Sequence, residues 1–548
     1  MFGAGGGTSS YRDVEETDLI VLWGSNARET HPIFFHHVLQ GVRNGAKLIV
    51  IDPRRSASAQ FADTWLGIDV GTDIALANAI GREIIAADLV HRTFVERATS
   101  GFAEYKSLVE SYTLERAEGI TGVPAAAIRA LAHAYAKADR AQICWTLGIT
   151  EHHNAVDNVT SIINLSLLTG HVGRPGSGLC PLRGQNNVQG GGDMGALPNK
   201  LPGGQDVDDP ALHAAWRRLW GGVEFPQKRG RHLTAMFEAM EHGDLTALFV
   251  LGENPMQSEA DCVRTEKLLR GLDCLIVQDV LRTATAEAAH VVFPAAASWC
   301  ESDGTVTSSE RRVQRVRKAL SPPGEARDDM AILAALAGRL GHNWGEPTAE
   351  ELWDELRQLS TWHRGMSYER LEALGGLQWP CPDATHPGSP FLHGRLWKNP
   401  IEGPRAPFCP AEDDPPVDRL NAEFPLRLTT GRRLESFNTG AQTNGYRSPL
   451  HRGESLDLSP EDCEKYGVTA GERVRICSRR GAIEAPVRVD PALRSGLAFM
   501  TFHFPDEVAT NRITIDATDP KSGTAEFKAA AIRIEKLVAA VSGSGGNR

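Results

Sequence analysis

One short pattern occurs twice between residues 18 and 284, and this duplication restricts the possible fold more than any other feature. The first copy runs from the apolar Leu19–Trp23 through Gly24-Ser25-Asn26 and a helical stretch to a second apolar run that ends in Asp52. The second copy runs from Leu248–Leu251 through Gly252-Glu253-Asn254 and a helical stretch to Gln278-Asp279. Short, fully apolar runs alternating with helices indicate buried parallel strands. The pattern therefore predicts two β-α-β units.

The residues between the strands of each unit are suited to nucleotide binding. Gly24 and Gly252 let the backbone approach a ligand closely, and the N-terminus of the following helix attracts a pyrophosphate. Asp52 and Asp279, at the ends of the second strands, are placed to accept hydrogen bonds from ribose hydroxyls or a guanine edge. Two matching units suggest a ligand with two nucleotides. The alternative is an ordinary α/β repeat in which Asn26 and Asn254 cap helices.

The bulk composition describes a multidomain globular protein. With 548 residues, 41% hydrophobic and 23% charged, we expect three or four domains. The net charge of −11 argues against nucleic acid or an anionic membrane as the main partner. The nine cysteines form no C-x-x-C, and residues 1–18 contain no apolar signal core, so we expect reduced thiols in a cytoplasmic protein without membrane insertion.

Four regions are expected along the chain. Residues 1–185 form the first α/β domain, with Asp73 predicted to cap the helix that ends near Ala87. Residues 186–298 form a second α/β domain, and residues 299–415 form a polar connector. From residue 416 to 548, alternation of β-branched residues with arginines predicts a compact β-barrel.

Arg183 is the first candidate for contact with a substrate. It lies in Pro181-Leu-Arg-Gly-Gln-Asn-Asn187, a segment with few apolar side chains to build a core. A guanidinium group binds a small carboxylate through two hydrogen bonds and keeps its charge. The alternative is an arginine that forms an ion pair across domains. His152 and His153 are candidate proton carriers, with polar packing as the alternative. Lys528 is a candidate phosphate ligand, with a solvent-exposed lysine as the alternative.

The segment from Pro181 to Asn199 resembles the catalytic alpha subunit of molybdenum- or tungsten-dependent formate dehydrogenases, within the DMSO reductase superfamily. Similar motifs continue through Asp52-Pro-Arg54, Gly252-Glu-Asn-Pro255 and Leu428-Thr-Thr-Gly431, so the resemblance covers essentially the whole chain. It implies a barrel of the double-psi type and two molybdopterin guanine dinucleotides on one metal ion. It also implies that Arg183 orients formate, which is oxidised to carbon dioxide.

The resemblance implies a set of cofactor-binding residues spread over three domains. They are Gly24, Ser25, Asn26, Asp52, Arg54, Gly71, Asp73, Gly184, Gln185, Gly252, Glu253, Asn254, Gln278, Asp279, Gly431, Arg432, Asn438, Gln442, His503, Asn511 and Lys528. The implied partners are formate and an electron-transfer subunit, or a ferredoxin-linked or NAD-linked protein.

The sequence departs from the family pattern at its start. The family has a cysteine or selenocysteine metal ligand, and a [4Fe–4S] domain, ahead of the segment that Gly3–Ser10 resembles, and neither is present. We therefore expect a truncated form without its own metal ligand, in which the second α/β domain has an incomplete sheet with exposed edges.

Three alternatives remain open at this stage. The first is a non-catalytic molybdopterin-binding remnant or partner-dependent subunit, and the second is a related oxyanion reductase. The third, an NAD-dependent dehydrogenase, is disfavoured because no G-x-G-x-x-G follows a strand.

Overall fold

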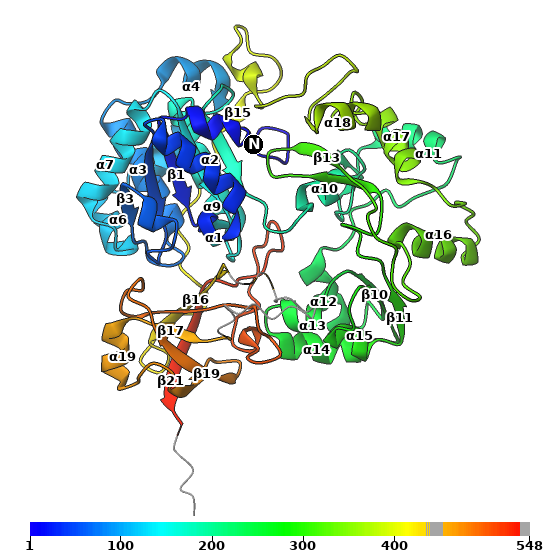
Figure 1. The fold of residues 1–548 in the computed structure, drawn as a ribbon. Helices are drawn as coiled ribbons and strands as arrows, with labels where there is room; N and C mark the ends of the chain where they lie inside the picture. Colours follow the sequence, from blue (N-terminus) through cyan, green and yellow to red (C-terminus); the bar gives the residue numbers. More distant parts are fainter. Residues whose placement is uncertain (435, 437, 439–452, 538–548) are drawn as a thin grey trace, which may run out of the picture.

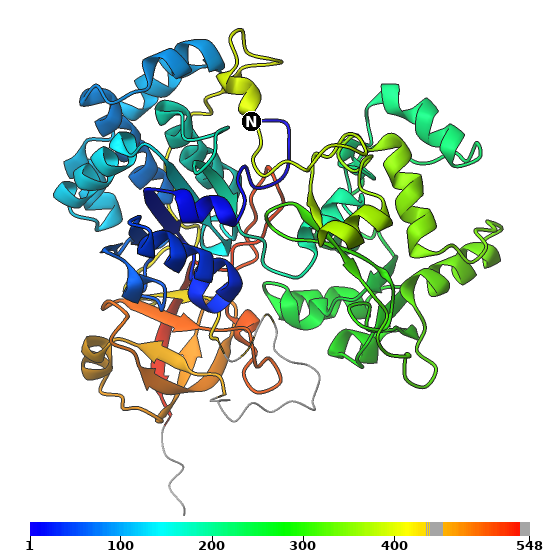
Figure 2. The same ribbon diagram turned by 45° about the horizontal axis from the view of Figure 1, so that its top comes forward.

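The computed structural model describes residues 1–434, 436, 438 and 453–537 of the chain. They form a first α/β domain, a second lobe and a C-terminal barrel, which Figure 1 shows in blue to cyan, in green and in orange to red. The barrel lies next to the first domain in both ribbon views, and the second lobe lies beside the two (Figure 2).

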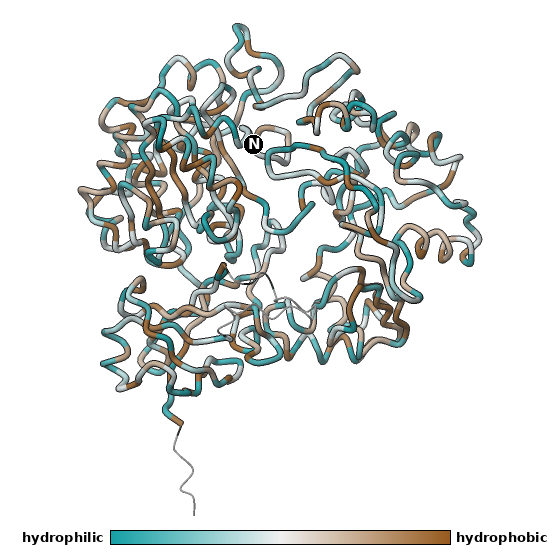
Figure 3. Tube along the Cα trace, in the orientation of Figure 1, coloured by the Kyte–Doolittle hydropathy of each residue, from teal (hydrophilic) through white to brown (hydrophobic). Residues whose placement is uncertain are grey.

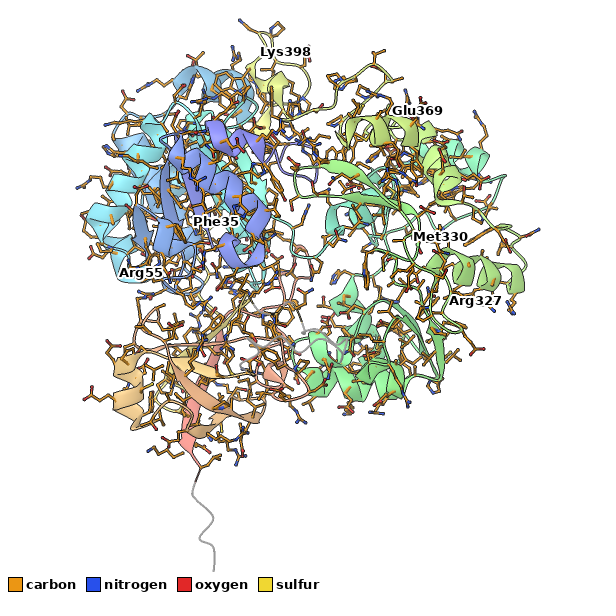
Figure 4. All side chains as sticks on the ribbon, in the orientation of Figure 1. Phe35, Arg55, Arg327, Met330, Glu369 and Lys398 are labelled. Atoms are coloured by element: carbon orange, nitrogen blue, oxygen red, sulfur yellow. The ribbon has the colours of Figure 1, made fainter. Side chains whose placement is uncertain are left out.

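The first domain is built on a fully parallel five-stranded sheet of order β3-β2-β1-β5-β6. The apolar runs predicted from the sequence are its central strands, and all five residues of β1 are buried. Helices α3 and α9 contribute Ile80 and Leu165 to the large core on one face, while Phe35 of α2 packs into the core on the other. Figure 3 shows the apolar strands in brown, and Figure 4 shows Phe35 within this domain.

The elements of the first domain follow one another closely along the chain. They are η1 (Arg12–Glu16), β1 (Leu19–Trp23), α1 (Ala27–Thr30), α2 (Pro32–Arg43), β2 (Lys47–Ile51), η2 (Ala59–Phe61), β3 (Thr64–Leu66), α3 (Asp73–Ala86), α4 (Arg92–Ala98), β4 (Thr99–Ser100), α5 (Phe102–Val109), α6 (Leu114–Thr121), α7 (Ala125–Lys137), β5 (Ala141–Trp145), α8 (Leu147–Thr150), α9 (Ala155–Thr169) and β6 (Gly178–Pro181).

The second lobe contains a parallel sheet of order β11-β10-β9. Its elements are α10 (Val188–Asp193), β7 (Lys200–Leu201), β8 (Gln205–Asp206), α11 (Pro210–Leu219), α12 (Leu233–Glu241), β9 (Ala247–Leu251), α13 (Pro255–Ser258), α14 (Cys262–Arg270), β10 (Cys274–Asp279), α15 (Ala284–Ala288) and β11 (Val291–Pro294). Phe237, Leu269 and Ala286 pack against one face of this sheet. Strand β11 lies at an edge and exposes Val291 and Val292 by 42% and 45%.

The predicted connector contains regular structure of its own. Its elements are β12 (Gly304–Thr307), β13 (Arg312–Val316), α16 (Asp329–Arg339), α17 (Ala349–Leu359), α18 (Tyr368–Leu374), β14 (Leu377–Gln378), η3 (Gly394–Trp397) and β15 (Ala406–Pro407). Strands β12 and β13 form an antiparallel hairpin within the second lobe, whereas β15 pairs with β4 of the first domain. Met330 of α16 and the preceding Arg327 lie on the side of the lobe far from the first domain (Figure 4).

The C-terminal region is a closed six-stranded barrel of order β16-β20-β17-β19-β18-β21, as the sequence predicts. Its elements are β16 (Leu426–Thr430), β17 (Leu456–Leu458), α19 (Pro460–Tyr466), β18 (Arg473–Cys477), β19 (Ala482–Val489), β20 (Leu497–Met500), η4 (Thr510–Arg512) and β21 (Ala530–Lys536). Closure leaves no free strand edge, and the inward apolar side chains form one core around Leu428, Val474 and Ile532.

Candidate active site

A cavity of about 380 Å³ lies where the first domain, the barrel and one corner of the second lobe meet. Loops at the carboxyl ends of β1, β2 and β5 form one wall, where ligands of parallel sheets bind. Residues after β16 and β20 form the opposite wall. Fourteen of the predicted cofactor residues line it: Gly24, Asn26, Asp52, Arg54, Gly71, Asp73, Gly184, Gln185, Glu253, Gly431, Arg432, Asn438, His503 and Lys528.

The two β-α-β units that are similar in sequence also share individual hydrogen bonds in the structure. In the first unit, Asn26 Oδ1 accepts from the backbone N and the hydroxyl of Ser58, at 3.2 and 3.1 Å. In the second unit, Asn254 Oδ1 accepts from the backbone N and the hydroxyl of Thr285, at 3.2 and 2.8 Å. Gly24 N and Gly252 N each donate to the neighbouring strand at 2.8 Å. The two asparagines therefore fix the same loop geometry.

The structure corrects two expectations about helix caps. Asn26 and Asn254 occupy the N-cap positions of α1 and α13, but neither side chain forms a capping hydrogen bond, because its oxygen is used for Ser58 or Thr285. Asp73 does not cap α3 either, since Thr72 is the N-cap residue. Asp73 is instead the first helical residue, and its carboxylate accepts from Trp23 Nε1 at 2.8 Å.

Two arginines and one lysine of the described residues line the cavity. The guanidinium of Arg54 lies 3.6 Å from the ring centroid of Phe499, and Arg432 Nε donates to the carbonyl of Ser436 at 2.9 Å. Lys528 Nζ lies 2.7 Å from a carboxylate oxygen of Glu151. This set of donors is suited to diphosphate groups, because arginine and lysine bind phosphate oxygens through charge-assisted hydrogen bonds.

Two further cavity residues have defined roles as acceptors or donors. Burial raises the pKa of Asp52 to about 6, although Arg54 partly opposes the shift. Asp52 Oδ1 accepts from Arg54 N, so the second oxygen of this carboxyl group is suited to a donor such as a guanine edge. His503 Nε2 accepts from the backbone N of Arg433, so its Nδ1 carries the proton and donates to the carbonyl of Asn438 at 2.7 Å.

Six other predicted cofactor residues, all within the described part of the chain, do not line this cavity. Ser25 is buried beneath it, and its hydroxyl has no hydrogen-bond partner among the described residues. Gln278 donates to Asp329, and Asp279 accepts from the backbone of Val280. Asn511 donates to two carbonyls at the end of α13 and joins the barrel to the second lobe. Gly252 and Asn254 lie on the second unit, and Gln442 lies outside the described residues.

Arg183 lies next to the cavity, directly before Gly184 and Gln185, but does not itself line it. Its Nε donates to Gln189 Oε1 at 3.1 Å, and its Nη2 donates to the carbonyl of Gly5 at 2.9 Å. Among the described residues, no salt bridge of Arg183 with a carboxylate is found. Burial lowers the pKa of Arg183, and Asp193 partly restores it.

Several cavity residues were not singled out from the sequence as ligands. They include His31, Thr146, Glu151, Glu259, Phe499 and Phe502, and His152, a candidate proton carrier, also lines the cavity. His31 Nε2 pairs with the carbonyl of Arg183 and so ties the substrate-candidate loop to the first domain. Burial, followed by the charge of Glu253, raises the pKa of Glu259 to about 7. Only the fold brings these residues together, so no local pattern identifies them.

A buried ionisable cluster lies behind one wall of the cavity. The carboxylate of Glu526 lies 3.2 Å from Nδ1 of both His152 and His153. Although burial alone would raise the pKa of Glu526, the two histidines hold it well below its usual range. Burial alone would lower the pKa of His152, but Glu526 raises it above the ordinary value. The cluster links the first domain to the barrel.

Metal ligands, cysteines and long apolar helices are the remaining features of the described residues. Among the residues that it describes, no group of three or more His, Cys, Asp or Glu side chains is placed to hold a metal ion. All nine cysteines are free. In the same described part of the chain, no helix has the length and apolar character needed to span a bilayer.

Comparison with known proteins identifies the family. Residues 4–339 match the model of the molybdopterin oxidoreductase family, and residues 426–531 match the molybdopterin dinucleotide binding domain. The chain belongs to the molybdopterin oxidoreductase family. It therefore binds a molybdopterin dinucleotide cofactor and is an oxidoreductase, as predicted.

Two relatives place the chain more closely within this family. It is 40% identical over 541 residues to formate dehydrogenase 2 subunit alpha of Methanococcus maripaludis, covering 98% of this chain and 79% of the relative. It is 35% identical to formate dehydrogenase H of Escherichia coli, covering 98% and 75%. The prediction of a formate dehydrogenase-type molybdopterin oxidoreductase is confirmed.

A solved structure supports the same fold. Acetylene hydratase from Pelobacter acetylenicus superposes with a TM-score of 0.72 at 21% identity, over 97% of this chain and 79% of the hydratase. At this identity the match supports the α/β and barrel architecture, and the predicted fold class is confirmed.

Proposed function

We propose that this oxidoreductase converts formate to carbon dioxide, a proton and two electrons at a molybdenum or tungsten ion carried by two molybdopterin guanine dinucleotides. The electrons would pass to an electron-transfer subunit or to a ferredoxin-linked or NAD-linked protein. The observation that supports the proposal most strongly is the cavity, where fourteen predicted cofactor residues from three parts of the fold lie together beside the Arg183 loop. The names of the relatives favour formate as the substrate.

The chemistry of the cavity fits one guanine dinucleotide. Arg54, Arg432 and Lys528 would bind its diphosphate, and Asp52 would accept hydrogen bonds from guanine or ribose. Gly24, whose φ is +56°, lines the cavity at the end of β1. When bound, the metal centre of the cofactor supplies the two-electron redox chemistry.

The second β-α-β unit would hold the second dinucleotide. Support for this assignment comes from the hydrogen bonds of Asn254, which reproduce those of Asn26, and from Glu253, which reaches the cavity. Gly252, Gln278 and Asp279 are the remaining residues proposed for this site.

Arg183 would bind the carboxylate of formate. Its loop is fixed at two backbone atoms: the N donates to Ser309 Oγ at 2.8 Å, and the carbonyl pairs with His31. The guanidinium thus stays beside the cavity, where it orients a one-carbon anion and offsets its charge.

The test is formate-dependent reduction of a viologen dye by the chain purified from a host that makes the cofactor. Relative to the wild type, we expect Arg183→Ala to lose at least about 100-fold in kcat/KM, the range seen when an oriented charge contact is removed. Arg140→Ala, which removes an exposed ion pair with Asp18, serves as the matched control. Equal activity of the two variants would refute the role of Arg183.

A further inference from the structure

The guanidinium of Arg183 has two edges, and only one of them is occupied. The edge formed by Nε and Nη2 is bound by Gln189 Oε1 and by the carbonyl of Gly5. Among the described residues, no partner is recorded for Nη1. The edge formed by Nη1 and the second hydrogen of Nη2 is therefore the one left for a carboxylate, which guanidinium groups bind through two parallel hydrogen bonds.

The orientation of the Gln189 amide decides which edge is occupied. Gln189 Nε2 donates to the carbonyl of Gly5 at 3.1 Å and to Asp193 Oδ1 at 2.9 Å. Both partners are acceptors only, so the NH₂ group must face them. The amide oxygen is consequently turned to Arg183 Nε. A flipped amide would place two donors against each other there and an oxygen against the Asp193 carboxylate.

Asp193 is built to hold that amide. Gln189 and Asp193 are four residues apart on α10, so their side chains share one helix face. Both are buried, with 4% and 2% of their surfaces exposed. The second oxygen of Asp193 accepts from Trp379 Nε1 at 2.7 Å, and Trp379 is stacked on Trp362 with ring centroids 4.5 Å apart. The Asp193 carboxylate accepts from Gln189 Nε2 and Trp379 Nε1 at once. An amide in its place would accept from only one of them, because its NH₂ group is a donor.

We propose that Gln189, oriented by Asp193, is a positioning residue that occupies the Nε edge of Arg183 and so presents the Nη edge to the substrate carboxylate. The proposal deepens the proposed function, because it rests on Arg183 as the formate-binding residue. It adds two residues of α10, Gln189 and Asp193, that are not among the residues lining the cavity beside Arg183. Their effect on the reaction passes through Arg183 alone.

The test uses Gln189→Leu in the full-length, cofactor-loaded chain, with two measurements. The first is the rate at which phenylglyoxal, a guanidinium reagent, modifies Arg183, followed by peptide mass mapping. Phenylglyoxal reacts with the two Nη nitrogens. Without the Gln189 amide on Nε the guanidinium can turn and expose them more, so we expect modification to be at least about fivefold faster, since a hydrogen bond to a charged group is lost. The second is steady-state kinetics, in which we expect KM for formate to rise about tenfold while kcat changes less than about twofold.

Gln205→Leu is the matched control. Like Gln189, Gln205 has a side-chain amide that donates to a carbonyl, that of Leu359; its oxygen, however, accepts from Trp216 Nε1 and not from an arginine. It should leave both measurements unchanged. Asp193→Asn is the second variant, in case Gln189→Leu does not fold. We expect Asp193→Asn to shift both measurements in the same direction as Gln189→Leu. The amide NH₂ group cannot accept, so either Gln189 Nε2 or Trp379 Nε1 loses its acceptor.

The possible outcomes separate the two claims. Wild-type modification rate and wild-type KM in a folded Gln189→Leu or Asp193→Asn variant would overturn the positioning role. Faster modification of Arg183 in Gln189→Leu, together with an unchanged KM in Arg183→Ala, would support the positioning of the guanidinium and refute Arg183 as the formate ligand.

Discussion

The duplicated glycines provide a matched pair for measuring how closely the backbone is packed beside the cavity. Gly24 and Gly252 occupy the same position in the two units, with φ of +56° and +64°. A Cβ atom on Gly24 would lie 2.8 Å from the carbonyl carbon and 3.1 Å from the Cα of Gly148. A Cβ atom on Gly252 would meet nothing within 4 Å. The two Gly→Ala variants therefore share the backbone strain and differ in the steric clash.

The expected costs follow from these two terms. The left-handed conformation costs a residue with a side chain about 1–2 kcal/mol, which the lower entropy of the unfolded chain partly offsets, so Gly252→Ala should lose about 1 kcal/mol. Gly24→Ala should lose a further 1–3 kcal/mol or so, because backbone atoms of Gly148 must shift. Gly148→Ala should also be destabilising, since its Cβ atom would lie 2.5 Å from the carbonyl oxygen of Gly24.

Native-state hydrogen exchange with peptide-level mass spectrometry measures the two losses separately, because β1 and β9 report on different parts of the fold. Relative to the wild type, we expect exchange in β1 to accelerate more in Gly24→Ala than exchange in β9 accelerates in Gly252→Ala. The difference between the two accelerations should correspond to about 1–3 kcal/mol. Equal losses in the two variants, or a larger loss in Gly252→Ala, would refute the packing argument.

Three further predictions concern the buried Glu526 cluster, the second β-α-β unit and a cationic residue of the cavity. Glu526→Gln should destabilise the fold by about 3 kcal/mol near neutral pH, because it leaves a buried charge on His152 without its partner. In the wild type, the depressed pKa of Glu526 gives stability that is present above about pH 4.3 and lost as the pH falls further. The raised pKa of His152 gives stability that is present below about pH 6.5 and lost as the pH rises through the higher folded pKa. The denaturant midpoint should therefore change less across about pH 3–9 in the variant than in the wild type. Asn254→Ala should cost about 2–3 kcal/mol by urea unfolding, since two donors at Thr285 lose their acceptor; a loss below about 0.5 kcal/mol would contradict this. Arg54→Ala should lower the guanine nucleotide content of the purified protein, because one diphosphate ligand and its contact with Phe499 are lost, and unchanged content would count against its role.

The sequence predicted the strands well because their signals are local. The apolar run at Leu19–Trp23 matches β1 residue for residue, and the run at Leu248–Leu251 matches β9 except for its first residue. The helix after Asn26 was predicted as one stretch, but the structure has a short α1 and then α2, because Pro32 begins a new helix.

The site was less predictable than the strands. The loops with Gly24 and Asp52 were found because each follows an apolar run directly. His31, Glu259 and the Gln189–Asp193 pair were missed as a site, since their roles depend on partners far away in the chain. Arg311 shows the same limit: it lies in the stretch predicted as a polar connector, yet it is fully buried and donates to four backbone carbonyls.

The guanine nucleotide content of the chain tests the central claim most directly. The chain would be purified from a host that makes the molybdopterin guanine dinucleotide, and acid hydrolysis would release its nucleotides for quantification beside the bound molybdenum or tungsten. The duplicated β-α-β units predict about two GMP per metal ion. One GMP per metal ion would contradict a role for the second unit, and the absence of guanine nucleotide would contradict the cofactor assignment as a whole.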